Sequence, residues 1–234
     1  MTASQLAEAL SAKEQDGTAY IRLKMENGKD TIQVQIKSRG GPKSSAIVYQ
    51  VLWPKERKGE GVLLHKSGHS FSGATFTPPN TLRTLDSAQL RDPLLGSALS
   101  LEDVVDSFFS WDQQTLDGTE TVNGVNCQIL ESKPGKSGGS YGVVRSWIDV
   151  RRLVPLRVEK YSSPGHLVRR IDTTRVAQDD KGHPITANLT VHDMRSGAET
   201  QLDGSRIRHD VSFSDAEFTP EGLKTVTGPK GSGE

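Results

Sequence analysis

The sequence predicts a mainly β (α+β) protein built on one curved antiparallel sheet with a few helices. Apolar and polar residues alternate along most of the chain, which is typical of strands with one buried face. Turn signals such as Asn-Gly and Pro-Gly recur about every 8–14 residues, the spacing of consecutive antiparallel strands. We therefore expect about ten to twelve strands. Because each strand has one apolar face, the sheet should curl around a core, a helix or a ligand.

Two segments have the sequence pattern of helices. Residues 2–5 (Thr-Ala-Ser-Gln) match a capping box, and Leu6 and Leu10 follow it at a spacing of four. Residues 100–103 (Ser-Leu-Glu-Asp) are a similar helix start. Apolar residues then repeat at the spacing of one helix face: Leu101, Val104, Val105 and Phe108. We expect both helices to cover the sheet as a lid or plug.

The segment around Asn27 and Gly28 predicts a β-hairpin. Asn-Gly suits a two-residue type I′ turn because both of its positions take φ > 0. With the turn at these two residues, Leu23 is expected opposite Ile32, and Ile21 opposite Val34. The apolar face of this hairpin would then consist of Ile21, Leu23, Ile32, Val34 and Ile36.

The alternating pattern continues through the rest of the chain. Further strands are expected at 46–53, 61–66, 69–77, 81–86, 113–121, 125–132, 141–150, 155–162, 166–177, 184–194, 198–203 and 206–213. A chain of 234 residues suits one domain, because large β sandwiches and barrels reach this size as a single unit. We expect a domain at 1–226, a mobile glycine-rich loop at 134–139 and a flexible tail at 227–234.

Composition argues against several functional classes. There are 29 basic (Lys+Arg) and 29 acidic (Asp+Glu) residues, so the formal net charge is zero, whereas a nucleic-acid-binding protein needs a basic excess. No apolar run approaches the roughly 18 residues of a membrane-spanning helix, so we expect membrane contact to be peripheral at most. The single cysteine, Cys127, excludes an internal disulfide and a thiolate metal cluster.

The sequence motifs do not support a catalytic or metal site. Residues 68–72 (Gly-His-Ser-Phe-Ser) lack the second glycine of a nucleophile elbow. Residues 135–137 (Gly-Lys-Ser) lack the first glycine of a phosphate-binding loop, which would fall at Leu130. The six histidines show no local metal-ligand spacing, although distant strands can assemble such a site. We expect no catalytic residues, no metal and no cofactor.

Several stretches of the chain resemble the LolA-like outer-membrane lipoprotein-sorting proteins, in particular a longer branch from environmental bacteria. Residues 96–104 (Gly-Ser-Ala-Leu-Ser-Leu-Glu-Asp-Val) are similar to that branch's Gly-Ser-Asp-Phe-Ser-Tyr-Glu-Asp-Leu segment. Residues 125–131 resemble its Cys-x-Val-Leu-Glu stretch. The most specific part is 147–149 (Trp-Ile-Asp) followed by 153–157 (Leu-Val-Pro-Leu-Arg). The resemblance covers about residues 18–224.

The resemblance implies an incomplete barrel of about eleven antiparallel strands, with helices as lid or plug and an apolar cavity for acyl chains. It also implies a non-enzymatic periplasmic carrier or chaperone that binds lipoprotein acyl chains or another lipid during transport toward the outer membrane. Envelope transport proteins would be its partners. Residues 1–6 lack the pattern of a signal peptide, which fits either the native start of a cytosolic protein or a chain from which an export signal was removed. The resemblance implies the second, so we expect the signal to have been removed. The candidate cavity residues are Ile21, Leu23, Ile32, Val34, Ile36, Leu101, Val104, Val105 and Phe108.

Two other hypotheses remain open at the level of sequence. The first is a structural or protein-interaction module of the cell envelope, built on the same scaffold and without lipid cargo. The second is a small-molecule enzyme on a β barrel, which would need converging acids or histidines inside the barrel. Each candidate cavity residue can also simply fill a dry core.

Overall fold

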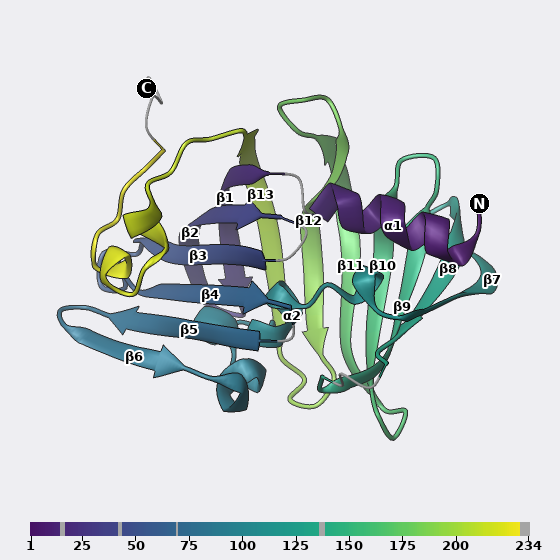
Figure 1. Cartoon of the computed structure of the whole chain (residues 1–234), viewed down its shortest axis with the longest axis horizontal. Coiled ribbons are helices and arrows are strands. Elements are labelled where there is room, and N and C mark those ends of the chain that lie inside the picture. Colours follow the sequence, from purple (N-terminus) through teal and green to yellow (C-terminus); the bar gives the residue numbers. More distant parts are fainter. Residues whose placement is uncertain (15–16, 42–43, 69, 136–138, 230–234) are drawn as a thin grey trace. The chain divides into compact units, whose positions relative to one another are not determined.

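The computed structural model describes residues 1–14, 17–41, 44–68, 70–135 and 139–229. The chain divides into two compact units (Figure 1). Unit 1 comprises Met1–Glu14 and Asp106–Leu202, and unit 2 comprises Gln15–Val105 and Asp203–Glu234. The single domain expected at 1–226 stays a prediction. The expected loop at 134–139 and tail at 227–234 lie partly outside the described residues, and their mobility also stays a prediction.

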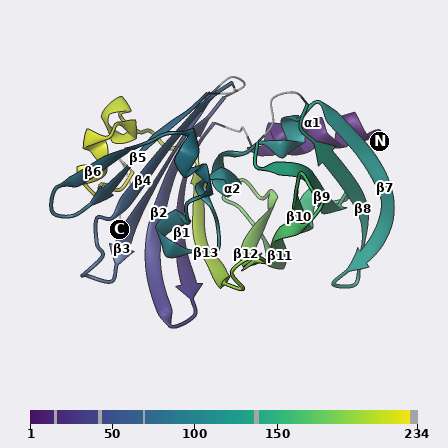
Figure 2. The ribbon, with the colours of Figure 1, turned by 90° about the horizontal axis from the view of Figure 1, so that it is seen from below.

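Unit 2 is an antiparallel sheet in which consecutive strands are neighbours, as Figures 1 and 2 show. Its strands are β1 (Thr18–Asn27), β2 (Asp30–Gly40), β3 (Ser44–Trp53), β4 (Gly61–Ser67), β5 (Ser70–Thr77) and β6 (Thr81–Leu85). The order from the sheet edge is β6-β5-β4-β3-β2-β1, followed by β13 (Glu199–His209). Residues 203–209 of β13 belong to this unit.

Unit 1 has the strand order β13-β12-β11-β10-β9-β8-β7. Its strands are β7 (Gln113–Val122), β8 (Val125–Lys133), β9 (Tyr141–Asp149), β10 (Val154–Ser162), β11 (Leu167–Gln178) and β12 (Pro184–Asp193), with residues 199–202 of β13. The expected break between strands at 198–203 and 206–213 is wrong. β13 is one continuous strand from Glu199 to His209.

The predicted fold class is confirmed. The chain is mainly β, and its strands are antiparallel in a sheet that does not close, as in an incomplete barrel. Within the residues that the structure describes there are thirteen strands, where about eleven were expected.

The β1–β2 hairpin is confirmed, but its turn lies one residue further along the chain than predicted. Gly28 adopts a φ of +62° and begins the turn, whereas Asn27 remains in the strand ladder. Leu23 therefore faces Val34 instead of Ile32. The pairing shifts by two residues, and a shift of two keeps every side chain on the face predicted for it.

Helix α1 (Ala3–Glu14) begins at the predicted capping box. The backbone N–H of Thr2 donates to Oε1 of Gln5 over 2.9 Å, and the N–H of Gln5 donates to Oγ1 of Thr2 over 3.2 Å. Leu6 and Leu10 are buried against apolar side chains of β8, β9 and β10, including Leu130. Within unit 1, α1 thus plugs one face of the sheet, as Figure 1 shows.

The second predicted helix is much shorter than expected. Helix α2 covers only Leu101–Val105, and Phe108 lies in a separate 3₁₀ turn, Phe108–Ser110, which belongs to unit 1. The helix cannot continue because Ser107 has non-helical backbone angles (φ −107°, ψ 66°). The predicted lid face is therefore not a single helix face. None of the helices among the described residues is long and apolar enough to cross a membrane.

Candidate functional site

Unit 2 presents an apolar face on β1 and β2. Cross-strand pairing places Ile21 opposite Ile36 and Leu23 opposite Val34, on the side of the sheet that also carries Ile32. The three β2 residues are at most 7% exposed, and the two β1 residues are half-buried. The structure thus brings together the five strand residues that the sequence predicted.

This face continues into β3 and β4. Ile36 lies opposite Tyr49, which in turn lies opposite Val62, and Val34 pairs with Val51. Tyr49, Val51 and Val62 are all buried. Burial raises the pKa of Tyr49 well above its usual range, so its hydroxyl stays neutral at ordinary pH. The result is an apolar strip that extends across four strands.

A cover segment, residues 86–105, packs on this sheet. It contains two 3₁₀ turns, η1 (Ser87–Arg91) and η2 (Leu94–Gly96), followed by α2; both η2 and α2 contact β4. The segment folds back on itself: the Leu94 N–H donates to the Leu99 carbonyl over 2.8 Å, and the Leu101 N–H donates to the Asp92 carbonyl over 3.0 Å. Leu94 and Leu101 are fully buried, so the segment forms an ordered wall.

A pocket of about 540 Å³ lies between the cover segment and strands β4–β6. This volume is within the range of about 300–1,000 Å³ that is typical of small-molecule sites. Its apolar lining consists of Val62, Phe76, Leu85, Pro93, Leu95 and Leu101. Its polar lining includes Arg57, Glu60, Thr75, Thr77, Arg83, Thr84, Gln89 and Asp92. The lining therefore suits an amphipathic ligand better than a bare hydrocarbon.

Two of the charged pocket residues form an ion pair. Arg57 donates from Nε and Nη2 to the carboxylate of Glu60, with an Nη2–Oε2 distance of 2.6 Å, and Nη2 also approaches the Leu95 carbonyl at 3.3 Å. Hydrogen bonding to Glu60 raises the pKa of Arg57 above its usual value. These contacts tie the loop that precedes β4 to the cover segment.

The predicted site residues are distributed unequally around this pocket. Of the nine, Leu101 lines it, and Val105 (buried) and Val104 (half-buried) lie in the same short helix. The five strand residues form the face that reaches the pocket through Val62. Phe108 belongs to unit 1, where it packs with α1. The role of these residues as walls of a lipid cavity stays a prediction.

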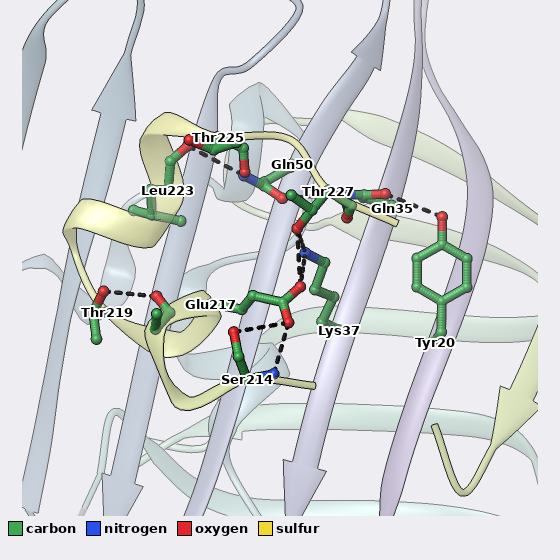
Figure 3. Close-up of polar contacts among 11 residues, drawn as sticks. Tyr20, Gln35, Lys37, Gln50, Ser214, Glu217, Thr219, Leu223, Thr225 and Thr227 are labelled. Atoms are coloured by element: carbon green, nitrogen blue, oxygen red, sulfur yellow. Dashed lines mark hydrogen bonds and ion pairs between the residues drawn. The ribbon is translucent and has the colours of Figure 1, made fainter. Parts of the chain in front are cut away.

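The sequence did not reveal that the opposite face of β1–β4 is also covered. The C-terminal segment, residues 211–229, lies on it and contains η4 (Asp215–Phe218) and η5 (Glu221–Lys224) (Figure 3). Lys37, which is 1% exposed, pairs with Glu217 at 2.7 Å and donates to Oγ1 of Thr227 over 2.8 Å. Gln50 donates to the Leu223 carbonyl over 3.1 Å. Alternating polar residues in these strands therefore bind the chain terminus.

Solved structures place this arrangement in the class of LolA-like folds. A DUF1329 family protein from Desulfovibrio piger matches with a TM-score of 0.84 at 24% identity, covering 94% of this chain and 97% of that one. A candidate outer membrane lipoprotein-sorting protein domain from Vibrio parahaemolyticus gives 0.83 at 20%, with 95% and 98% covered. A LolA superfamily protein from Nitrosomonas europaea gives 0.70 at 19%, with 94% and 98% covered. The resemblance inferred from sequence is thus confirmed at the level of fold.

A family model narrows this class further. The model, described as "Uncharacterized protein", matches residues 43–225, and the chain belongs to that family. No curated protein matches the sequence of the chain. The description carries no activity, so the pocket and the fold must support any proposal about function.

Proposed function

We propose that this protein is a non-enzymatic carrier or chaperone of the periplasm that holds the acyl chain of a lipoprotein, or of another lipid, on its way to the outer membrane. The observation that supports this proposal is the pocket of about 540 Å³ in unit 2, next to the apolar strip. Val62 belongs to both, so the pocket borders the apolar strip at this residue.

The energetics of acyl chains favour such a site. Each CH₂ group removed from water contributes about 0.8 kcal/mol to the free energy of binding, so burying even part of an acyl chain favours its binding. A carrier must also release its cargo, which disfavours full enclosure by a rigid wall. Here one wall is the cover segment, which is built from short helical turns between Ser87 and Val105 instead of a long helix. Short turns of this kind are expected to open at lower free-energy cost than the sheet.

The fold supports the location and the partners that we propose. Two of the similar structures are described as a candidate outer membrane lipoprotein-sorting domain and as a LolA superfamily protein. By analogy, envelope transport proteins would deliver and receive the cargo, and the protein would touch a membrane only at its surface.

A binding titration tests this proposal. Delipidated protein is titrated with a fluorescent fatty acyl probe, and the wild type is compared with Thr75→Trp, which places an indole in the pocket from half-buried Thr75. The matched control is Thr121→Trp, on the exposed part of edge strand β7 in unit 1. We expect saturable binding by the wild type, weakened at least about tenfold by Thr75→Trp and unchanged by the control. Equal binding by Thr75→Trp, or no saturable binding by the wild type, would contradict the proposal.

A further inference from the structure

The pocket has a gradient of polarity along one cross-strand row. Val62 on β4 lies opposite Thr75 on β5, which lies opposite Arg83 on edge strand β6. Val62 is 4% exposed, Thr75 is half-buried and Arg83 is exposed. All three line the pocket. The row therefore changes from apolar to cationic between the interior of the sheet and its edge, which matches the polarity of a lipid whose head group lies at the edge.

The charged lining residues identify the chemistry of that head group. Arg57 and Glu60 neutralise each other through their ion pair. Among the residues that the structure describes, the side chains of Arg83 and Asp92 form no ion pair, and both line the pocket. Asp92 is held in place by the fold of the cover segment, where its carbonyl accepts the hydrogen bond from Leu101. The pocket thus offers one unpaired cation and one unpaired anion.

We infer that the pocket takes a single-chain lipid with a zwitterionic head group, in which a phosphate is followed by a protonated amine; this inference rests on the proposed function. The phosphate contacts Arg83, because a guanidinium group binds phosphate oxygens through paired hydrogen bonds. The amine contacts Asp92, and the chain extends toward Val62 and Leu101. A purely anionic head group would leave Asp92 facing a like charge, and a neutral head group would leave both side chains unpaired.

Three palmitoyl lipids with different head groups test the inference. They are lysophosphatidylethanolamine (zwitterionic), lysophosphatidylglycerol (anionic) and monopalmitoylglycerol (neutral), each used below its micelle concentration to displace the fluorescent acyl probe. The wild type should bind the zwitterionic lipid about threefold to fivefold more tightly than the other two, as expected for partly exposed charge pairs. Arg83→Gln should weaken the binding of both phospholipids by a similar factor and leave the binding of the neutral lipid unchanged.

A second pair of variants separates the two charges. Asp92→Asn should weaken the binding of the zwitterionic lipid alone, so that this lipid no longer binds more tightly than the anionic one. The controls are Lys58→Gln and Glu56→Gln, which remove exposed charges on the neighbouring loop outside the pocket lining. Neither control should change the affinity for any of the three lipids. If Arg83→Gln abolished the binding of both phospholipids while Asp92→Asn left their affinities unchanged, the zwitterionic assignment would be overturned in favour of a simple anionic head group.

The remaining outcomes distinguish this inference from the proposed function. Equal binding of the three lipids, with both charge variants unchanged, would overturn the inference and leave the carrier function standing. If no lipid displaces the probe and the probe itself does not bind, the carrier function fails and the inference fails with it.

Discussion

The ion pair between Lys37 and Glu217 should control how firmly the C-terminal segment is attached to unit 2. Glu217 also accepts hydrogen bonds from the Ser214 N–H over 2.8 Å and from the Thr227 hydroxyl over 2.9 Å (Figure 3). These donors hold the pKa of Glu217 at about 2, below its ordinary 4.5, even though burial acts in the opposite direction. Replacing Glu217 by Gln removes the negative charge and leaves Lys37 buried without its counter-ion.

The size of this effect follows from the pKa difference. The shift from 4.5 to about 2 corresponds to about 3 kcal/mol of stability at neutral pH. The carboxylate is 15% exposed, and solvent screening reduces the expected cost of Glu217→Gln to about 2 kcal/mol. Because the folded-state pKa is the lower one, this stabilisation is complete above about pH 4.5 and is lost as the pH falls toward 2.

Urea unfolding followed by circular dichroism measures this effect between pH 3 and pH 7. We expect Glu217→Gln to be less stable than the wild type at pH 7, and the difference in free energy of unfolding to narrow as the pH falls toward 3. The control is Asp215→Asn, which breaks the neighbouring 2.6 Å pair with Arg39; Asp215 is 96% exposed, so no measurable change is expected. If Glu217→Gln were as stable as Asp215→Asn at pH 7, the reasoning would be refuted.

Three further predictions concern packing. Gly73→Ala should destabilise the protein by about 1–3 kcal/mol in urea unfolding, because a Cβ would lie 2.5 Å from the Leu63 carbonyl oxygen. The control Gly41→Ala, whose Cβ would have no atom closer than 3.8 Å, should have little effect, and equal losses of stability would refute this reasoning. Leu10→Ala should cost about 2–5 kcal/mol, measured in the same way, because Leu10 is buried between α1 and the unit 1 sheet, and a cost below about 1 kcal/mol would contradict that packing. Burial raises the pKa of the Cys127 thiol, so this thiol should resist alkylation until the protein is unfolded. Mass spectrometry measures the alkylation, and rapid labelling of the native protein would contradict the burial of Cys127.

Local features of the fold could be predicted from the sequence because they depend on neighbouring residues. The capping box between Thr2 and Gln5 needs only the spacing of two side chains, and it forms as expected. Alternation placed Leu23 and Val34 on the same face, although the turn was misplaced by one residue. That error left the faces intact because side chains on strands repeat every two residues.

Features that depend on tertiary packing were missed. The i, i+3, i+4, i+7 pattern from Leu101 to Phe108 is genuine, but the helix ends at Val105, and Leu101 and Phe108 belong to different units. The polar residue Lys37 reads as solvent-exposed in an alternating strand, and only the partner that arrives 180 residues later, Glu217, explains its burial.

The candidate site, too, could be predicted only in part, because it depends on tertiary packing. Leu101 was predicted as a cavity residue, but the pocket also needs the loop before β4 and the edge strand β6. Arg57 and Arg83 come from these two elements, and no spacing in the sequence links them to each other or to the cover segment. The signal that could have pointed to the edge strand is Arg83, because it lies two residues before the buried Leu85 and therefore on the same face of β6.

Photo-crosslinking of a diazirine fatty acid tests the central claim most directly, because it reports where a bound chain lies. After irradiation of delipidated protein and proteolysis, mass spectrometry should find the label in peptides of β4–β6 and of residues 87–101, and excess unlabelled lipid should abolish it. Label confined to other peptides, or label that unlabelled lipid does not compete away, would contradict the account.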